Sequence, residues 1–210
     1  MKKEVHCPSC GAPVVFQSAA SVMAVCGYCS STLVRHDLDL ENMGKMAQLQ
    51  ADGSPLQLRA EGRYRGASFT VVGRIQLRFA KGLWNEWHLL FDDRRSGWLG
   101  EAAGTYAVSF PVRVPEAIPK FEELHAGKAV VLNKQPYEVT DVEEADCIGG
   151  EGELPFSIGP GYSTPAADLA GPENQFATLD YSEDPPLVFT GEYVEFDDLH
   201  LSGLREIDGW

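Results

Sequence analysis

Apolar and polar side chains alternate most regularly between Phe69 and Phe79, which predicts a strand with one buried face. A second such run, Leu83 to Phe91, follows after a break that contains Gly82. We expect the two runs to form a hairpin with a three-residue loop, because this register keeps the apolar faces together. It pairs Ile75 with Trp87 on the apolar face, and on the polar face Arg74 with His88, Gln76 with Glu86 and Arg78 with Trp84.

Shorter runs predict further strands at Val14–Phe16, Val22–Val25, Trp98–Leu99, Tyr106–Phe110, Ala177–Tyr181 and Leu187–Val194, the first two joined by a polar tip. Residues 37–50 place Leu and Met at helical spacing around Gly44, so we interpret this segment as a linker with at most a short helix. Residues 149–175 are rich in Gly, Pro and small side chains and predict a long loop.

The second half of the chain resembles the first in one short pattern. Residues 66–71 align with residues 134–139, because each segment has an aromatic residue two positions before a valine, after a turn. The expected fold is mainly β: an N-terminal four-cysteine zinc ribbon followed by two similar small β-barrel-like or β-sheet units. The expected domains are the ribbon at 1–37, a linker at 38–52, a basic β unit at 53–118 and an acidic, looser copy at 119–210.

Four cysteines give the strongest chemical signal in the sequence. Cys7 and Cys10 form one C-x-x-C pair, and Cys26 and Cys29 form another, with fifteen residues between the pairs. Two such knuckles at this spacing are typical of a four-cysteine zinc site, since each short loop turns two thiolates inward. All four ligands are thiolates, so we expect a structural Zn²⁺ with no open position for a nucleophilic water.

Two alternatives to zinc fit the sequence less well. A pair of disulfides requires an oxidising compartment, and residues 1–6 contain no apolar signal-peptide region. A redox C-x-x-C requires a surrounding βαβ pattern, which the sequence lacks. We therefore expect a cytoplasmic protein, and no apolar run is long enough to predict a transmembrane segment.

The net charge of −14 is divided unevenly along the chain. Residues 1–100 carry 12 Lys and Arg against 9 Asp and Glu, whereas residues 101–210 carry 5 against 22. A ribbon that binds nucleic acid usually has a basic face, but residues 1–40 hold three residues of each sign. The acidic half would repel phosphate as well. The charge pattern thus argues against nucleic acid as the partner.

The predicted hairpin carries the candidate binding residues. Trp84 with Arg74 and Arg78 combines an aromatic ring with fixed positive charge, which is a composition common in protein interfaces. Glu86 and His88 are candidates for an acid–base or metal site, although exposed surface polarity is the simpler interpretation. Large aromatic residues often anchor cores, so we expect the other hairpin tryptophan, and the one at position 98, to be buried.

Acidic residues cluster in the second half, near Cys147. We interpret the cluster either as a site for a cation, a polyamine or a basic protein surface, or as a solvated face. EF-hand spacing is absent. The members of the cluster are Asp141, Glu143, Glu144, Asp146, Glu151 and Glu153.

Three segments of the first half occur together: Gly66-x-x-Phe69-x-Val71-x-Gly73-Arg74, Trp84-Asn85-Glu86-Trp87 and Gly97-Trp98-Leu99. In this combination they resemble a bacterial family known as domain of unknown function 4178. The resemblance is close from about residue 53 to 110 and looser from 124 to 204. It implies an N-terminal zinc ribbon, which members often carry, and no catalytic residues. It also implies an association with membrane-linked or polyamine-related proteins.

Three functions remain in competition. The main prediction is a non-catalytic zinc-ribbon protein that acts as an adaptor or assembly factor and binds a protein partner. One alternative is a nucleic-acid-binding protein that uses the ribbon and the arginines between Arg59 and Arg95. The other is an enzyme accessory or an enzyme of unrecognised type. Its type is unrecognised because the motifs for phosphate binding, serine hydrolysis, zinc proteolysis and dinucleotide binding are absent.

Overall fold

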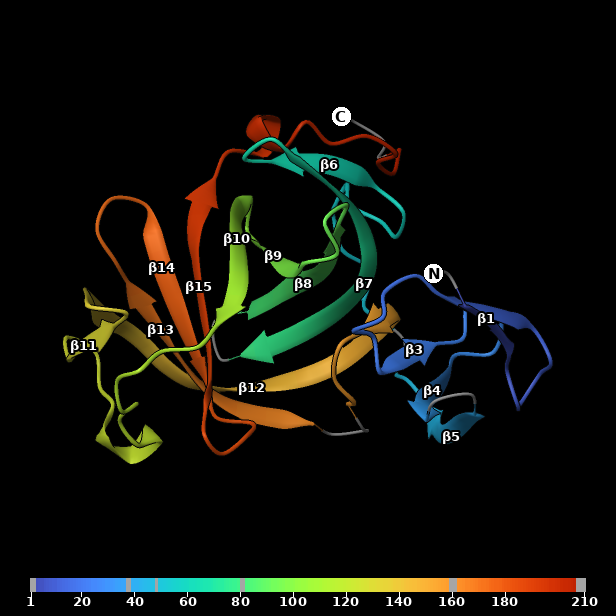
Figure 1. Cartoon of the computed structure of the whole chain (residues 1–210), viewed down its shortest axis with the longest axis horizontal. Helices are drawn as coiled ribbons and strands as arrows, with labels where there is room; N and C mark the ends of the chain where they lie inside the picture. Colours follow the sequence, from blue (N-terminus) through green and yellow to red (C-terminus); the bar gives the residue numbers. More distant parts are fainter. Residues whose placement is uncertain (1–2, 37–38, 48, 80–81, 159–161, 207–210) are drawn as a thin grey trace.

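The computed structural model describes residues 3–36, 39–47, 49–79, 82–158 and 162–206, which form an almost entirely β structure (Figure 1). The N-terminal strands are β1 (Lys3–His6), β2 (Pro13–Phe16), β3 (Met23–Val25), β4 (Ser31–His36) and β5 (Asp39–Lys45). The next are β6 (Glu61–Tyr64), β7 (Ala67–Phe79), β8 (Gly82–Phe91), β9 (Ser96–Ala102) and β10 (Thr105–Val112). The last are β11 (Ala129–Leu132), β12 (Gln135–Leu154), β13 (Ser163–Ala170), β14 (Gln175–Asp180) and β15 (Leu187–Val194), with short 3₁₀ turns at Phe121–Glu123 and Phe196–Leu199. None of the described segments forms a helix with the length and hydrophobicity needed to cross a membrane.

Eight of these strands form a closed antiparallel barrel. Strands β7 to β10 follow one another as a meander, and β12 to β15 form a second meander. Strand β10 pairs with β15, and β7 pairs with β12, which closes the ring (Figure 1). An interior of this size is either filled by side chains or holds one small ligand.

The two segments aligned in the sequence occupy equivalent places in the fold, with an offset of 68 residues. The tight turns before β7 and β12 occupy equivalent positions, Arg65-Gly66 and Asn133-Lys134, and all four turn residues have positive φ. Backbone hydrogen bonds recur at the same offset: Arg59 N donates to Val71 O, and Gly127 N donates to Val139 O. The two copies do not form separate sheets, because each contributes four strands to the same barrel.

The register predicted for the β7–β8 hairpin is wrong by one position. Phe79 pairs with Gly82, and Arg74 pairs with Trp87, whereas residues 80–81 lie outside the described part of the chain. The prediction assumed that only one face of the hairpin is covered. Both faces of β7 and β8 are covered in the barrel, so a rule that separates apolar from polar faces could not select the register.

Two N-terminal predictions also need correction. Strands form where they were expected, at Pro13–Phe16 and Met23–Val25, but they do not pair with each other. Each C-x-x-C knuckle instead makes its own hairpin, β1 with β2 and β3 with β4. The predicted linker contains β5, which pairs with β4, while residues 37–38 and 48 of that segment are not described. Pairing with a neighbouring strand here outweighs the helix propensity of Leu and Met.

The loop predicted at residues 149–175 is wrong as well. Strand β12 continues to Leu154, and β13 begins at Ser163. Glycines suggested a loop, but they allow strands to approach closely: a Cβ atom on Gly152 would lie 2.3 Å from the carbonyl oxygen of Val72. Gly150 and Gly152 therefore mark a close approach of β12 to its paired neighbour β7.

Apolar side chains pack on both sides of the barrel wall. On the outer side of the wall formed by the first-half strands, Trp87 lies in a core that includes Leu56 and Leu199 from the flanking segments. A second outer core surrounds Tyr137 and includes β11. A third core contains Ile75 and other residues that face the barrel interior. The wall is thus covered on both faces over much of its length.

The N-terminal unit, β1 to β5, is attached to the barrel through the end of β12. Strand β3 pairs with Glu153 and Leu154, the last two residues of β12. The Glu153 carboxylate accepts hydrogen bonds from the backbone nitrogens of Gln17 and Ser18, at 2.8 and 3.1 Å. Met23 is fully buried and belongs to the same core as the interior-facing residues of the barrel. The ribbon therefore covers part of the barrel interior.

Candidate functional site

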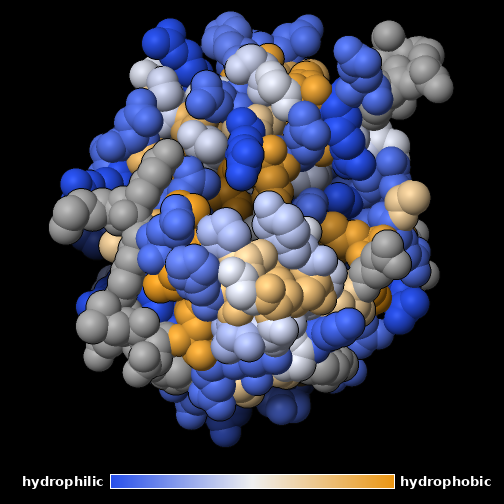
Figure 2. Space-filling model, turned by 90° about the vertical axis from the view of Figure 1, so that its right-hand side faces the viewer, coloured by the Kyte–Doolittle hydropathy of each residue, from blue (hydrophilic) through white to orange (hydrophobic). Residues whose placement is uncertain are grey.

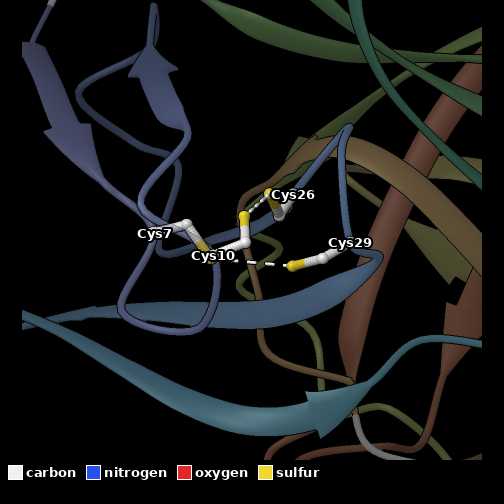
Figure 3. Close-up of side chains that lie close together, drawn as sticks. All are labelled: Cys7, Cys10, Cys26 and Cys29. Atoms are coloured by element: carbon white, nitrogen blue, oxygen red, sulfur yellow. Dashed lines mark hydrogen bonds between the residues drawn. The ribbon is translucent and has the colours of Figure 1, made fainter.

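The four predicted metal ligands come together, and their side chains converge on one another (Figure 3). All four Sγ atoms lie within 4.8 Å of one another. The Cys7 and Cys29 sulfurs are 3.8 Å apart, and the Cys10 and Cys26 sulfurs are 3.7 Å apart. A disulfide requires a separation of about 2.05 Å, so these four residues are free thiols that share one site.

The two knuckles have the same backbone design. The Gly11 nitrogen donates to the Cys7 carbonyl at 2.8 Å, and the Ser30 nitrogen donates to the Cys26 carbonyl at 2.9 Å. Gly11 and Ser30 both have positive φ, 76° and 57°. A glycine suits such a turn and is readable from the sequence, whereas a serine gives no such signal.

The cysteine cluster fits a tetrahedral metal site. Zinc–sulfur bonds of about 2.3 Å place the four sulfurs about 3.8 Å apart, which agrees with both measured separations. Hydrogen bonding to Ser31, whose Oγ lies 3.2 Å from the Cys29 sulfur, lowers the pKa of Cys29 to about 6. This favours the thiolate form that binds metals. All four positions of such a site would be filled by protein ligands.

A second candidate site is a cavity of about 280 Å³ inside the barrel. Its lining takes every second residue from the strands, such as Ile75, Leu77 and Phe79 of β7. Successive side chains of a strand point to opposite faces, so these positions define the barrel interior. The volume is near the small end of the range for small-molecule sites.

Aromatic rings form much of the cavity wall. Trp84 packs edge-on against Phe79 with ring centroids 4.7 Å apart, and Trp98 stacks on Phe156 at 5.7 Å. Trp98 is buried as predicted. Trp84 is half-buried; the observed register pairs it with Leu77 instead of the predicted Arg78, and its side chain lines the cavity.

Glu86 lies beside Trp84 in the cavity lining. Its Oε1 accepts a hydrogen bond from Trp84 Nε1 at 3.1 Å. Burial raises the pKa of Glu86 to about 7, and the negative charges of Asp168 and Asp180 contribute to the shift. The sequence was interpreted as placing Glu86 on the exposed surface, but its side chain lies in the wall of the cavity.

His88 is fully buried and does not line the cavity. Its Nδ1 lies 2.9 Å from the Glu153 carbonyl oxygen, and its Nε2 lies 3.0 Å from Ser96 Oγ. Burial lowers the pKa of His88 to about 4, so the ring is neutral at pH 7. Within the described residues, only the cysteine cluster brings three or more potential ligands close enough for a metal ion. Among the described residues, Glu86 and His88 therefore do not belong to a group of three potential metal ligands.

Arg74 lies on the outer side of the barrel wall, where its side chain is only 4% exposed. Its guanidinium packs over the Trp87 ring at 4.5 Å, donates to Asn85 Oδ1 at 2.6 Å and pairs with Asp52. Trp87 is fully buried, as predicted. Arg74 is thus buried and does not share an exposed surface with Arg78, which is exposed.

A buried carboxylate that sequence reasoning missed, Glu101, organises this outer network. It accepts hydrogen bonds from Ser54 Oγ at 2.6 Å, Trp87 Nε1 at 2.9 Å and Asn85 Nδ2 at 3.2 Å. The sequence around Glu101 resembles an ordinary turn and gives no signal of burial. The two even-numbered residues of the 84–87 motif thus face the cavity, and the two odd-numbered ones face this network.

Strand alternation divides the predicted acidic cluster on β12. Asp141 and Glu143 line the cavity, whereas Glu144 is exposed. Glu153 is buried under the ribbon, where it accepts the hydrogen bonds described above. The sequence indicated a run of acids but not which of them share a site.

The comparisons with known proteins agree with the resemblance seen in the sequence. No curated protein and no solved structure matches this chain. A family model matches residues 57–196, which is two thirds of the chain and includes every barrel strand. The chain therefore belongs to the family described as Domain of unknown function (DUF4178).

Proposed function

We propose that this protein is a non-catalytic binding protein whose barrel cavity holds a small organic molecule and whose cysteine cluster holds a structural zinc ion. The observation that carries the proposal is the cavity of about 280 Å³. Small-molecule sites typically combine apolar walls with a few placed polar groups. Trp84 and Trp98 supply the walls here, and Glu86 supplies one of the polar groups.

The four-cysteine site supports a structural rather than a catalytic role for the proposed metal. In the described part of the chain, the lining consists of carboxylates, hydroxyls, aromatic rings and small or aliphatic residues. Covalent catalysis usually pairs a nucleophile with an adjacent base, and metal-assisted hydrolysis needs an open metal position. A metal site with four cysteine ligands offers no such position, because four thiolates complete the tetrahedron.

Recovery of the bound molecule tests this proposal. The full chain is isolated under mild conditions from the cells that produce it, and molecules released by organic solvent are identified by mass spectrometry. We expect one small compound in a fixed ratio to protein. Ala166→Trp fills the cavity and should abolish recovery, whereas Ala170→Trp, at an exposed position on the same strand, should retain it.

Both variants must first give a single unfolding transition, so that loss of the ligand is not loss of the fold. Equal recovery from the two variants would place the molecule elsewhere on the protein. Recovery of nothing from the unmodified chain, together with no binding of small molecules in a thermal-shift screen, would refute the proposed function.

A protein-binding adaptor is a second candidate, and the surface of the N-terminal unit favours it. Figure 2 shows the molecule from the ribbon side, with hydrophobic atoms gathered near the centre of that face. Four of the exposed large hydrophobic residues belong to this unit: Val15, Val22, Tyr28 and Met43, of which Tyr28 is 78% exposed. Exposed aromatic and Met side chains are enriched in protein interfaces.

The adaptor role is tested by changing this surface alone. Tyr28→Ser combined with Met43→Ser should leave zinc content and unfolding unchanged and abolish the recovery of a specific protein partner in affinity purification. Val131→Ser removes an exposed apolar residue of β11 and serves as the matched control. Identical partner profiles for the double variant and the control would exclude the ribbon surface as the docking site.

A further inference from the structure

Carboxylates from several different strands border the barrel cavity, and Glu101 of β9, described above, is one of them. Glu86 comes from β8, Asp168 from β13 and Asp180 from β14, and β12 adds Asp141 and Glu143. None of the lining residues in the described ranges is Lys, Arg or His. The wall of the cavity therefore carries negative charge on several sides.

The positions of these carboxylates are fixed by hydrogen bonds. Thr178 Oγ1 donates to Asp168 at 2.8 Å, and Thr164 Oγ1 donates to Asp180 at 2.8 Å. Trp84 Nε1 donates to Glu86, as described above. Groups held in this way need little reorganisation when a ligand binds, which lowers the entropic cost of binding.

Aromatic rings line the same cavity as the carboxylates. Besides Trp84 and Trp98, the rings of Phe176 and Tyr193 lie together, with centroids 5.2 Å apart. The face of an aromatic ring carries partial negative charge and attracts cations within about 6 Å of its centroid. Carboxylates and aromatic faces attract the same class of ligand, since both favour positive charge on an otherwise apolar body.

We propose that the ligand of the barrel cavity is an organic cation, with an ammonium group among the carboxylates and aromatic rings and an alkyl part against the apolar wall. This inference rests on the proposed function and specifies the chemistry of its ligand. The ammonium is placed near Glu86 and Trp84, where a charged and an aromatic group are adjacent.

Other ligand classes fit the cavity less well. A metal ion needs several oxygen ligands at about 2.0–2.6 Å, but the described carboxylates form no group close enough to hold one. An anion would be repelled by the wall. A neutral molecule would displace water from the carboxylates without supplying a positive charge in its place, and removing water from a charged group is costly.

Matched cation and neutral probes test the inference on the full, metal-loaded chain. Choline is compared with 3,3-dimethylbutan-1-ol, in which carbon replaces the charged nitrogen, and 1,4-diaminobutane is compared with butane-1,4-diol. Binding is followed by calorimetry and by the fluorescence of the cavity tryptophans. We expect at least one cation to bind more tightly than its neutral partner by about tenfold or more.

Charge-removing variants locate the bound cation. Glu86→Gln and Glu143→Gln keep the size of the side chains and should each weaken cation binding by about tenfold. Glu144→Gln, one residue further along β12 and exposed, is the matched control and should leave affinity unchanged. Equal weakening in Glu143→Gln and Glu144→Gln would indicate only a general effect of net charge and would overturn the inference.

The outcome separates this inference from the proposed function. If neither cation binds more tightly than its neutral partner, while a neutral or anionic molecule is recovered and then lost in Ala166→Trp, the cavity binds a ligand but not a cation. If no small molecule binds at all, both proposals fail. Cation binding that persists in Ala166→Trp would place the cation on the surface and would also overturn the inference.

Discussion

Burial shifts the pKa values of two residues of β8 that lie two positions apart, one an acid and the other a base. It raises the pKa of Glu86 to about 7 and lowers the pKa of His88 to about 4. Desolvation disfavours the charged form in both cases, which moves the two pKa values in opposite directions. The two residues therefore give opposite pH dependences, and each can be measured separately.

The buried His88 should make the protein less stable in acid. Its pKa is below the usual value of 6.5 in the folded state, so the unfolded chain binds the proton first as pH falls. The stability that depends on neutral His88 is present above about pH 6.5 and is lost progressively down to about pH 4, to a total of roughly 3 kcal/mol. Urea unfolding across this range measures it.

A matched pair of variants assigns the effect to His88. His88→Gln should flatten the dependence of unfolding free energy on pH between 4 and 6.5, while His125→Gln, at an exposed histidine, should retain the slope. The same slope in both variants would mean that His88 titrates normally in the folded protein.

The affinity for the cation should change with pH near neutrality because of Glu86. A surface carboxylate would change the affinity only at lower pH, since its titration is complete below pH 6. Ionised Glu86 attracts the cation, and its pKa is about 7, so affinity should rise between pH 6 and 8. The groups that face it are Trp84, Asp168 and Asp180, and Cys147 is near enough to be affected by its charge. Calorimetry of choline binding should show proton release, and Glu86→Gln should abolish both effects.

At the scale of single elements, the sequence predicted strands better than it predicted their partners. The bounds of β15, Leu187–Val194, match the expected strand. The register of β7 against β8 was missed, because it depends on a barrel that covers both faces. Gly73 and Gly152 look like loop or bulge residues in the sequence, but their role is set by strands far away in the chain. Such close long-range contacts leave no periodic pattern in the sequence.

The close approach of β12 to β7 should tolerate no side chain at Gly73. A Cβ atom there would lie 1.9 Å from the Glu153 carbonyl oxygen, so backbone must move in either strand. We expect Gly73→Ala to lower the free energy of unfolding by roughly 3 kcal/mol, the upper part of the range for overpacking. Gly53→Ala, where a Cβ meets nothing within 4 Å, should change it by less than about 0.5 kcal/mol. Urea unfolding compares the two, and similar losses would show that the strands can separate without cost.

At the scale of the whole molecule, the repeat could be predicted but its assembly could not. The alignment of residues 66–71 with 134–139 identified equivalent turns, and their backbone geometry agrees at the same offset. Short repeats do not specify whether the copies close separately or together. Closure depends on the pairings β10–β15 and β7–β12, which join the two halves. The cavity exists only as a result of that closure, so its lining residues could not be grouped from the sequence.

Loss of the metal site should therefore affect the barrel as well as the ribbon. If the ribbon and the barrel had separate cores, Cys26→Ser would unfold only the ribbon. Met23, however, is fully buried in a core shared with barrel residues, and the Glu153 carboxylate depends on donors from Gln17 and Ser18. An unfolded ribbon removes Met23 from this core and leaves the carboxylate without those donors, which should cost the barrel roughly 3 kcal/mol.

Elemental analysis and urea unfolding of Cys26→Ser test this coupling. We expect one zinc per chain in the unmodified protein, none in Cys26→Ser, and one in the control Cys147→Ser, because Cys147 is not part of the cysteine cluster. The barrel transition, followed by the fluorescence of the buried Trp87 and Trp98, should move to lower urea in Cys26→Ser alone. Zinc loss with an unchanged barrel transition would mean that the two parts are stable independently. Cation binding weakened in parallel with the transition would mean that the ribbon, by covering part of the barrel interior, also maintains the cavity.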